Sequence, residues 1–178
     1  RVKRRTVACA PEPPGFGRAA SDADLPRVAA LLNHAHAGRT FYALQSAASL
    51  AERLARAPHA YSAASFQITD RAAIGLWLSG EDFEEARGGV VRRRRPATVV
   101  DYGYGGAAGL DDLGALIDTA RRRAAAAGMT HLVLYVGEGA PELDAIAPRA
   151  SAIDSFILRS PMPEPPAHVI AYADALFI

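Results

Sequence analysis

Hydrophobic and polar positions follow two periods along this chain, and together they predict a mixture of strands and helices. Residues 98–102 and 129–136 are runs dominated by apolar residues, which indicates buried strands. Residues 110–127 between them carry a helical pattern, and Gly128 suits the left-handed residue that often ends a helix. Because a helix separates the two strands, we expect them to pair in parallel.

The connection between the first of these strands and the helix is predicted to be a glycine-rich turn over residues 103–109. A helix that begins after such a turn offers free backbone N–H groups to an anion, which favours a phosphate-bearing ligand. With a helix that starts at Leu110, however, Asp111 and Asp112 lie in the first turn and already satisfy the positive end of the dipole. The same stretch therefore both favours and opposes a phosphate site.

Two further helices are predicted in the first half of the chain. Apolar residues recur at helical spacing over residues 25–33, and residues 49–56 form a second helix. The loop over residues 33–42 contains His34 and His36, which are two positions apart and would not share a helix face, so we reject a metal-binding pair. This loop is either a substrate-facing segment or ordinary surface anchored by its aromatic residues.

Strands of alternating pattern are predicted at residues 61–69 and 72–79, joined by a tight turn at residues 70–71. The acidic residues 81–85 and the basic residues 92–95 then predict a long hairpin whose opposite charges face each other. The alternative is an arginine patch that holds a phosphate.

The two ends of the chain have different patterns. Residues 1–10 are basic and alternate loosely, which predicts an edge strand protected by its charges or, alternatively, a nucleic-acid-binding arm. Towards the other end we predict a helix at residues 142–147 and a strand at residues 152–160. Residues 169–178 are almost continuously apolar, which predicts a strand in the interior of the sheet.

Composition narrows the function classes. The 178 residues suit one domain with or without an appendage, and the net charge of +1 gives no general attraction to nucleic acid or to an anionic membrane. No apolar run approaches a membrane span, and the single cysteine, Cys9, allows neither an internal disulfide nor a cysteine zinc cluster. We predict a cytoplasmic protein without metal, in which residues 1–17 are a strand and linker that could be the tail of an upstream domain.

The order of these elements, β-α-α-β-β-β-α-β-α-β-β, resembles that of the GNAT N-acetyltransferase superfamily from residue 18 to residue 178. Residues 18–26 look like the family's opening strand and capped first helix, residues 74–77 like its third strand, and residues 99–136 like its cofactor-binding centre. The resemblance implies a GNAT-like α/β domain over residues 18–178, with a mixed sheet in which two central parallel strands splay apart. It also suggests one half of a tandem protein.

In that family acetyl-CoA lies between the splayed strands, and the turn before the helix holds its pyrophosphate. The resemblance places cofactor contacts at Tyr102, Tyr104, Gly105, Gly106, Ala107, Ala108 and Gly109. This turn departs from the family pattern, because it supplies small residues for a close backbone approach but no arginine or glutamine beside them.

Acetyl transfer to an amine needs a base for the ammonium proton and an acid for the leaving thiolate. By position, Asp101 and Glu81 are the candidate bases and Tyr135 is a candidate proton donor. Asp101 is alternatively a hydrogen-bonded structural residue.

Two functions stay open. The first is an acetyl-CoA-dependent N-acetyltransferase that acts on a small-molecule or peptide amine by direct transfer. The second is a GNAT-like domain that has lost cofactor binding and has a structural or partner-binding role beside an intact catalytic domain. An upstream domain of the same chain, or a second copy in a homodimer, would be the partner.

Overall fold

The computed structural model describes residues 2–8, 15–39, 42–56, 58, 61–78, 82–87, 89–137, 139–142 and 152–156. Its strands are β1 (Val2–Ala8), β2 (Arg18–Ala19), β3 (Phe66–Ile68), β4 (Ala72–Trp77), β5 (Phe83–Arg87), β6 (Val90–Arg94), β7 (Pro96–Tyr104), β8 (His131–Gly137) and β9 (Ala152–Phe156). Its α-helices are α1 (Leu25–His36), α2 (Ala47–Ala55) and α3 (Gly106–Ala126), with short 3-10 helices at Asp22–Asp24 and Ala63–Ser65.

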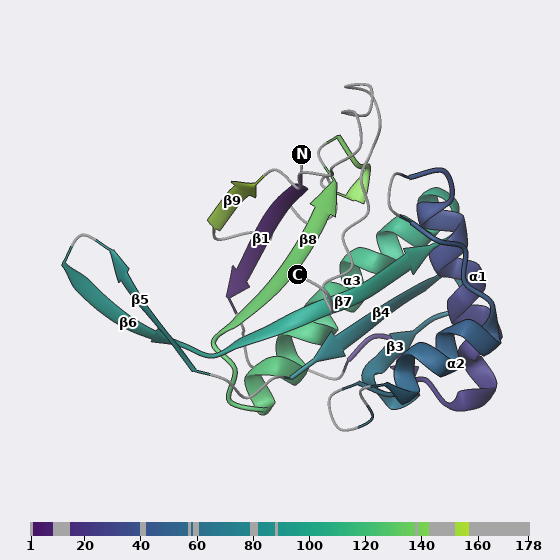
Figure 1. Ribbon diagram of the computed structural model, residues 1–178, viewed down its shortest axis with the longest axis horizontal. Helices are drawn as coiled ribbons and strands as arrows, with labels where there is room; N and C mark the ends of the chain where they lie inside the picture. Colours follow the sequence, from purple (N-terminus) through teal and green to yellow (C-terminus); the bar gives the residue numbers. More distant parts are fainter. Residues whose placement is uncertain are drawn as a thin grey trace.

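The described chain is a mixed α/β protein built on an open, mostly antiparallel sheet (Figure 1). The strand order is β2-β3-β4-β7-β8-β1-β9, and β5 and β6 form a separate two-stranded ribbon that projects away from the sheet (Figure 1). The pair β7 and β8 is parallel, and the other ladders among the described strands are antiparallel. The predicted parallel pairing of the two central strands is therefore confirmed.

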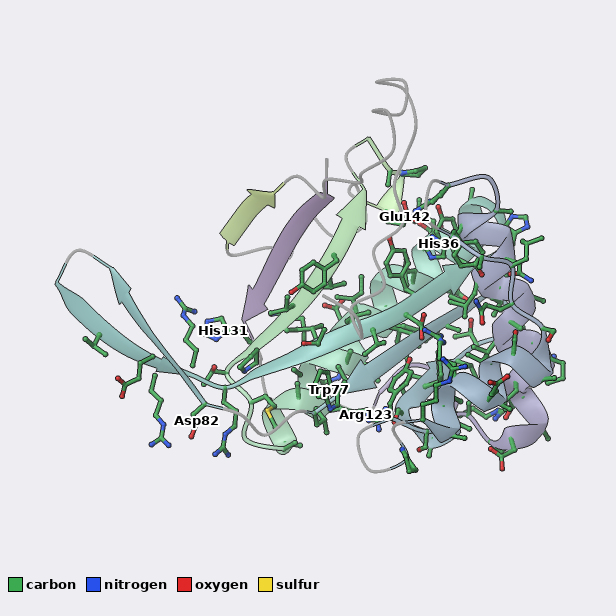
Figure 2. All side chains as sticks on the ribbon, in the orientation of Figure 1. His36, Trp77, Asp82, Arg123, His131 and Glu142 are labelled. Carbon is green, nitrogen blue, oxygen red and sulfur yellow. The ribbon has the colours of Figure 1, made fainter. Side chains whose placement is uncertain are left out.

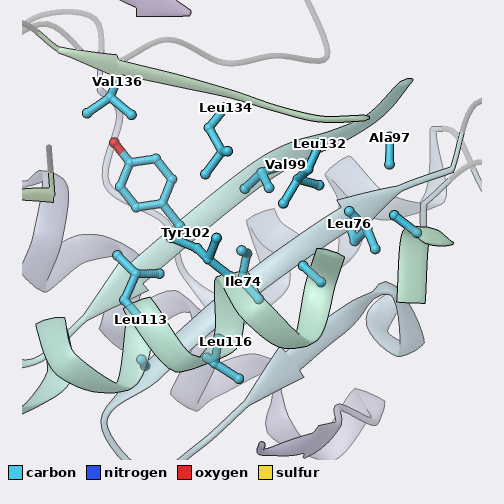
Figure 3. Close-up of a cluster of buried hydrophobic side chains, with 14 of the residues drawn as sticks. Ile74, Leu76, Ala97, Val99, Tyr102, Leu113, Leu116, Leu132, Leu134 and Val136 are labelled. Carbon is cyan, nitrogen blue, oxygen red and sulfur yellow. The ribbon is translucent and has the colours of Figure 1, made fainter. Parts of the chain in front are cut away.

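Helix α3 covers one face of the sheet because its apolar residues recur every three or four positions. Leu113, Leu116, Ile117, Ala120 and Ala124 are buried against side chains of β4, β7 and β8, in the cluster that Figure 3 shows. The small residues of this stripe let the helix lie close to the strands.

Helices α1 and α2 cover the other face and bury a second cluster that includes Leu32, Leu50 and Phe66. The Ser46 side chain accepts a hydrogen bond from the amide of Ser49 and so caps α2, which begins at Ala47, two residues before the predicted start. The predicted end of the first helix near residue 33 is wrong, because α1 continues to His36.

Two predictions about strands change, and a third is confirmed over the part that the structure describes. The predicted edge strand at the N-terminal end is interior, since β1 lies antiparallel between β8 and β9, from Val2 opposite Gly137 to Ala8 opposite His131. A local pattern of alternation cannot reveal a partner from the far end of the chain. The predicted strand over residues 61–69 is strand only at β3, after a 3-10 helix. Of the strand predicted over residues 152–160, residues 152–156 form β9, and residues 157–160 lie outside the described residues.

The hairpin predictions are confirmed. β3 and β4 pair around the turn at residues 70–71. In the ribbon, Glu84 lies opposite Arg93 and Glu85 opposite Arg92, as the charge pattern predicted. The predicted helix over residues 142–147, apart from Glu142, and the predicted strand over residues 169–178 lie outside the described residues.

Candidate functional site

The most distinctive feature of the sheet is the divergence of its two parallel strands. Their ladder begins with Pro96 opposite His131 and ends with Thr98 opposite Val133. β7 continues to Tyr104, still paired with β4, while β8 runs off at an angle (Figure 1). The candidate site is the region between the separated halves of these strands.

A β-bulge in β7 decides which side chains face this region. Gly75 pairs with Asp101 and Leu76 with Val99, which leaves Val100 as the extra residue. Val99 belongs to the core on the α3 side, whereas Val100 belongs to the core under α1 and α2. Because a bulge shifts the alternation by one residue, Asp101 also faces α2. The alternation of the sequence alone does not give this orientation.

Asp101, a predicted catalytic base, is fully buried and already hydrogen bonded. One carboxylate oxygen accepts hydrogen bonds from Arg53 Nη2 at 2.6 Å and from the Tyr61 hydroxyl at 3.0 Å. The Tyr61 ring lies over Gly75, where a Cβ atom would be 1.6 Å from the hydroxyl oxygen. These contacts agree with the structural alternative for Asp101, and a substrate amine would have to compete with a guanidinium for the carboxylate.

A second buried ion pair lies where the strands have separated. Arg39, just after α1, places Nη2 at 2.6 Å from Oε1 of Glu142, and both side chains are almost inaccessible to solvent. Burial and the negative charge of Glu142 raise the pKa values of Tyr102 and Tyr104, so both phenols stay protonated. Tyr102 packs in one cluster with Val136 of β8 (Figure 3). Side chains of the chain itself thus occupy the space between β7 and β8 on the α3 side.

His36 lies at the same end of β7, as Figure 2 shows beside Glu142. Its Nε2 is 2.6 Å from the carbonyl oxygen of Tyr102, and its ring contacts the rings of Tyr42 and Tyr102. Burial, together with the nearby charge of Arg39, lowers the pKa of His36 to about 3. His36 is therefore a neutral core residue, and the prediction of an exposed loop at this position is wrong.

This burial predicts a pH dependence of stability. The pKa of His36 is lower in the folded state than its ordinary value of about 6.5, so the unfolded chain binds more protons in this range. The contribution of neutral His36 to the free energy of unfolding is complete above pH ~6.5 and is lost as the pH falls toward about 3. Urea unfolding should show the wild type losing about 2 kcal/mol between pH 6.5 and pH 5 through this group.

A His36→Gln variant is the control for this prediction, since it keeps a polar side chain that cannot titrate. It should be less stable than the wild type at pH 7, but its stability should fall less steeply toward pH 5. Parallel curves for the two proteins would contradict the assignment.

The start of α3 differs from the prediction. β7 remains in its ladder through Tyr104, a single residue, Gly105, follows it, and the helix begins at Gly106, which has a φ of 67°. The predicted turn over residues 103–109 is therefore wrong, because cross-strand pairing with β4 holds the first part extended and the last part is helical. Asp111 and Asp112 consequently lie beyond the first turn, and that turn carries no acidic residue.

Asp112 has a structural role on the side of α3. Its carboxylate accepts hydrogen bonds from the Thr69 hydroxyl at 2.7 Å and from Arg71, at 3.3 Å from Nε and 3.0 Å from Nη2. The pair joins α3 to the turn between β3 and β4. The predicted repulsion between Asp112 and a phosphate at the helix start thus has no geometric basis.

Two backbone amides at this junction are already hydrogen bonded. The Gly105 amide donates to the Arg71 carbonyl at 2.8 Å, and the Gly106 amide donates to His34 Nε2 at 3.3 Å. Gly109 is buried so close to Arg71 that a Cβ atom would lie 2.6 Å from its carbonyl oxygen.

Of the predicted cofactor contacts, Tyr102, Tyr104 and Gly109 are therefore buried, and Gly105 and Gly106 use their amides within the chain. Ala107 and Ala108 are exposed at the first turn of α3 and remain open to an anion.

The other predicted catalytic residues are not joined into one constellation by the described contacts. Glu81 lies outside the described residues. Tyr135 is partly buried on β8 and alternates with Leu134 and Val136, which face α3, so it lies on the opposite face of that strand. In the described part of the chain no group of His, Cys, Asp or Glu residues has the arrangement of a metal site.

Sequence reasoning missed the partners that organise this region. Arg53 lies three positions from the buried Leu50 on α2, and a cation on the apolar side of a helix is a signal that could have been used. Arg39 and Glu142 are about a hundred positions apart in the sequence and carry no local signal that joins them.

None of the helices in the described residues is both long enough and apolar enough to cross a bilayer. Comparison of the sequence with protein-family models returns no match, and comparison with curated proteins returns none.

Proposed function

We propose that this chain is a GNAT-like domain that does not bind acetyl-CoA for catalysis and instead has a structural or partner-binding role beside a catalytic domain. The observation that carries the proposal is the filling of the region between β7 and β8. Tyr102 of β7 packs with Val136 of β8, and Glu142, buried with Arg39, lies close enough to Tyr102 to raise the pKa of its phenol, in the region where the family resemblance would put the cofactor arm.

The resemblance to the GNAT fold is supported by the centre of the sheet. β7 and β8 are parallel, pair only at their beginnings and flank a long helix. The bulge at Val100 bends β7 where it leaves the ladder with β8. These features agree with a sheet in which two central strands splay.

The backbone contacts expected for a pantetheine arm are less favourable here. In the family, backbone groups of the first splayed strand pair with that arm, whereas the Tyr102 carbonyl is already bound by His36. A ligand would have to displace a buried imidazole before it could pair with this carbonyl. Displacing a satisfied buried partner costs free energy, which opposes cofactor binding.

The phosphate end of a cofactor would meet a similar difficulty. A single residue joins β7 to α3, and the amides of Gly105 and Gly106 are hydrogen bonded within the chain. Only a short part of the helix start is left to bind a pyrophosphate. At both ends of the family's cofactor site, backbone groups that would bind the cofactor are thus hydrogen bonded within the chain.

The projecting ribbon supports a role in binding a partner. Val90 and Val91 of β6 are 54% and 62% exposed, and the ribbon extends from the body of the protein (Figure 1). A two-stranded hairpin is marginally stable alone in water, so contact with another surface would stabilise it. Two glutamates of the ribbon lie opposite arginines, so its excess of arginine is partly neutralised, and the exposed valines favour a protein surface, such as an upstream domain or a second copy, over nucleic acid.

Acetyl transfer is the second candidate, and two observations favour it. The early separation of β7 from β8 is the geometry that the cofactor would need, and the first turn of α3 has no acidic residue. In this case Asp101 would accept the proton of the attacking small-molecule or peptide amine, and Tyr135 would donate a proton to the leaving thiolate. The enzyme would need Arg39 and Glu142 to move apart when acetyl-CoA binds.

Thermal unfolding with acetyl-CoA separates the two candidates. A ligand at a hundred times its Kd stabilises a protein by about 2.7 kcal/mol, which is easily measured. We expect no stabilisation by millimolar acetyl-CoA beyond that given by equal concentrations of ADP, which controls for binding through phosphates alone. A larger effect of acetyl-CoA, or release of CoA with an amine acceptor, would refute the non-catalytic proposal.

A further inference from the structure

A second region of the molecule, away from the separated strands, is an open hollow with a volume of about 660 Å³. Three arginines from three different elements line it, namely Arg18 of β2, Arg27 of α1 and Arg71 from the turn before β4. Asp70 and Asp112 also line it, and Asp24 pairs with Arg18, so three carboxylates balance the three cations as long as Asp70 stays on Arg27. Phe16, Gly17, Ile68 and Thr69 complete the walls.

Two of the three guanidinium groups are held in place. Arg18 directs Nη1 and Nη2 at the carboxylate of Asp24, and Arg71 directs Nε and Nη2 at Asp112. The side chains of Asp24 and Asp112 are only 13% and 8% exposed, so these carboxylates are fixed anchors. A guanidinium has five N–H donors, and its pair with one carboxylate leaves others for a second acceptor. The pair of Arg71 with Asp112, for example, does not use Nη1.

Arg27 differs because its partner can leave. It pairs with Asp70, whose side chain is 87% exposed. Exposed ion pairs contribute little to stability, so Asp70 can turn into solvent while Arg27 takes another anion. The hollow therefore combines two oriented cations with one that is exchangeable.

The wall of the hollow is rigid beside these side chains. The Phe16 amide donates to the Thr119 hydroxyl of α3 at 2.9 Å, and that hydroxyl donates to the Phe16 carbonyl at 3.1 Å. Gly17 has a φ of 77° and lies so close to β3 that a Cβ atom would be 2.7 Å from the Ile68 carbonyl oxygen. Because the wall is fixed, the guanidinium groups lose little further conformational freedom when a ligand binds.

We propose that this hollow is a binding site for a small phosphate-bearing ligand, held by the guanidinium groups of Arg18, Arg27 and Arg71. Phosphate oxygens match the planar fork of a guanidinium and accept several charge-assisted hydrogen bonds at once. A divalent phosphate also replaces the charge of Asp70 when that side chain turns away. The site is independent of acetyl-CoA chemistry and of the proposed partner-binding role.

The test is a titration of the whole chain with inorganic pyrophosphate, monitored by the NMR chemical shifts of the backbone amides. Sodium chloride keeps the ionic strength constant during the titration. We expect saturable shifts at residues 16–18 and 68–71. The Arg27→Gln variant should weaken the affinity by about tenfold or more, through loss of a charged hydrogen-bonding partner.

Arg56→Gln is the matched control. Arg56 is also an exposed arginine paired with a carboxylate, that of Glu52, but it does not line the hollow. Its substitution should leave the affinity unchanged. An equal loss in Arg27→Gln and Arg56→Gln would overturn the proposal, because it would mean binding by general electrostatics. Absence of saturable shifts would overturn it as well.

Two further measurements keep the assignment falsifiable. Arg71→Lys keeps the positive charge but removes the planar fork, so it should also weaken pyrophosphate binding, and an unchanged affinity would count against guanidinium recognition. Citrate offers carboxylates in place of phosphates. Binding of citrate as tight as that of pyrophosphate would overturn the assignment to a phosphate-bearing ligand.

Discussion

Replacing Asp101 with alanine is expected to destabilise the protein by about 3–5 kcal/mol, because it leaves the guanidinium of Arg53 buried without its carboxylate. The side chain of Arg53 is 12% exposed and that of Asp101 is completely buried, so neither charge can be solvated without local unfolding. Tyr61 would lose its acceptor at the same time. Urea denaturation of wild type and variant at pH 7 measures the difference in the free energy of unfolding.

The double variant Arg53→Met, Asp101→Leu is the control for this prediction. Removing both charges leaves neither ion of this pair buried without the other, so most of the stability should return. A large interaction energy in this double-mutant cycle would identify the pair as a structural unit. Unchanged stability of Asp101→Ala, with loss of acetyl transfer by an intact fold, would instead support a catalytic carboxylate.

Replacing Gly103 with alanine is expected to destabilise the protein by about 3 kcal/mol, at the upper end of the usual range for overpacking. A Cβ atom at this position would lie 2.5 Å from the backbone carbon of Leu31 and the backbone nitrogen of Leu32. Backbone atoms of a helix cannot rotate out of the way as a side chain can, so α1 would have to move away from β7. Thermal unfolding of the variant checks the effect.

Gly105→Ala is the matched control for this substitution. At Gly105 the nearest atoms to a new Cβ are a Leu31 methyl group at 3.8 Å and the Arg71 carbonyl at 3.9 Å, and φ is −111°. We expect its effect to be within about 0.5 kcal/mol. Similar losses in the two variants would mean that glycine is needed here for a reason other than the contact with α1.

The close contact at Gly103 also bears on the candidate site. It brings the end of α1 over β7, which allows His36 to reach the Tyr102 carbonyl and Arg39 to reach Glu142. Gly103, which the sequence placed in the predicted glycine-rich turn, therefore allows the close approach of a helix of the same chain. This is the physical link between the packing of α1 and the filling of the region between β7 and β8.

Local patterns in the sequence were enough to predict the elements of the centre of the molecule. The apolar runs of β7 and β8 and the helical stripe of α3 predicted a strand, a helix and a strand with parallel pairing, and the structure has them in that arrangement. The charges of the ribbon likewise predicted its pairing. These features depend on neighbours in sequence and on the period of side-chain burial, so a single sequence carries them.

The tertiary structure decided the boundaries and the contacts of the site. Pairing with β4 extended β7 through Tyr104 and so moved the start of α3 to Gly106, and a bulge at Val100 turned Asp101 toward Arg53. β1 took an interior place, although its basic residues predicted an edge. Each of these outcomes depends on a partner distant in sequence, and local periodicity contains no information about which distant surface a residue will meet.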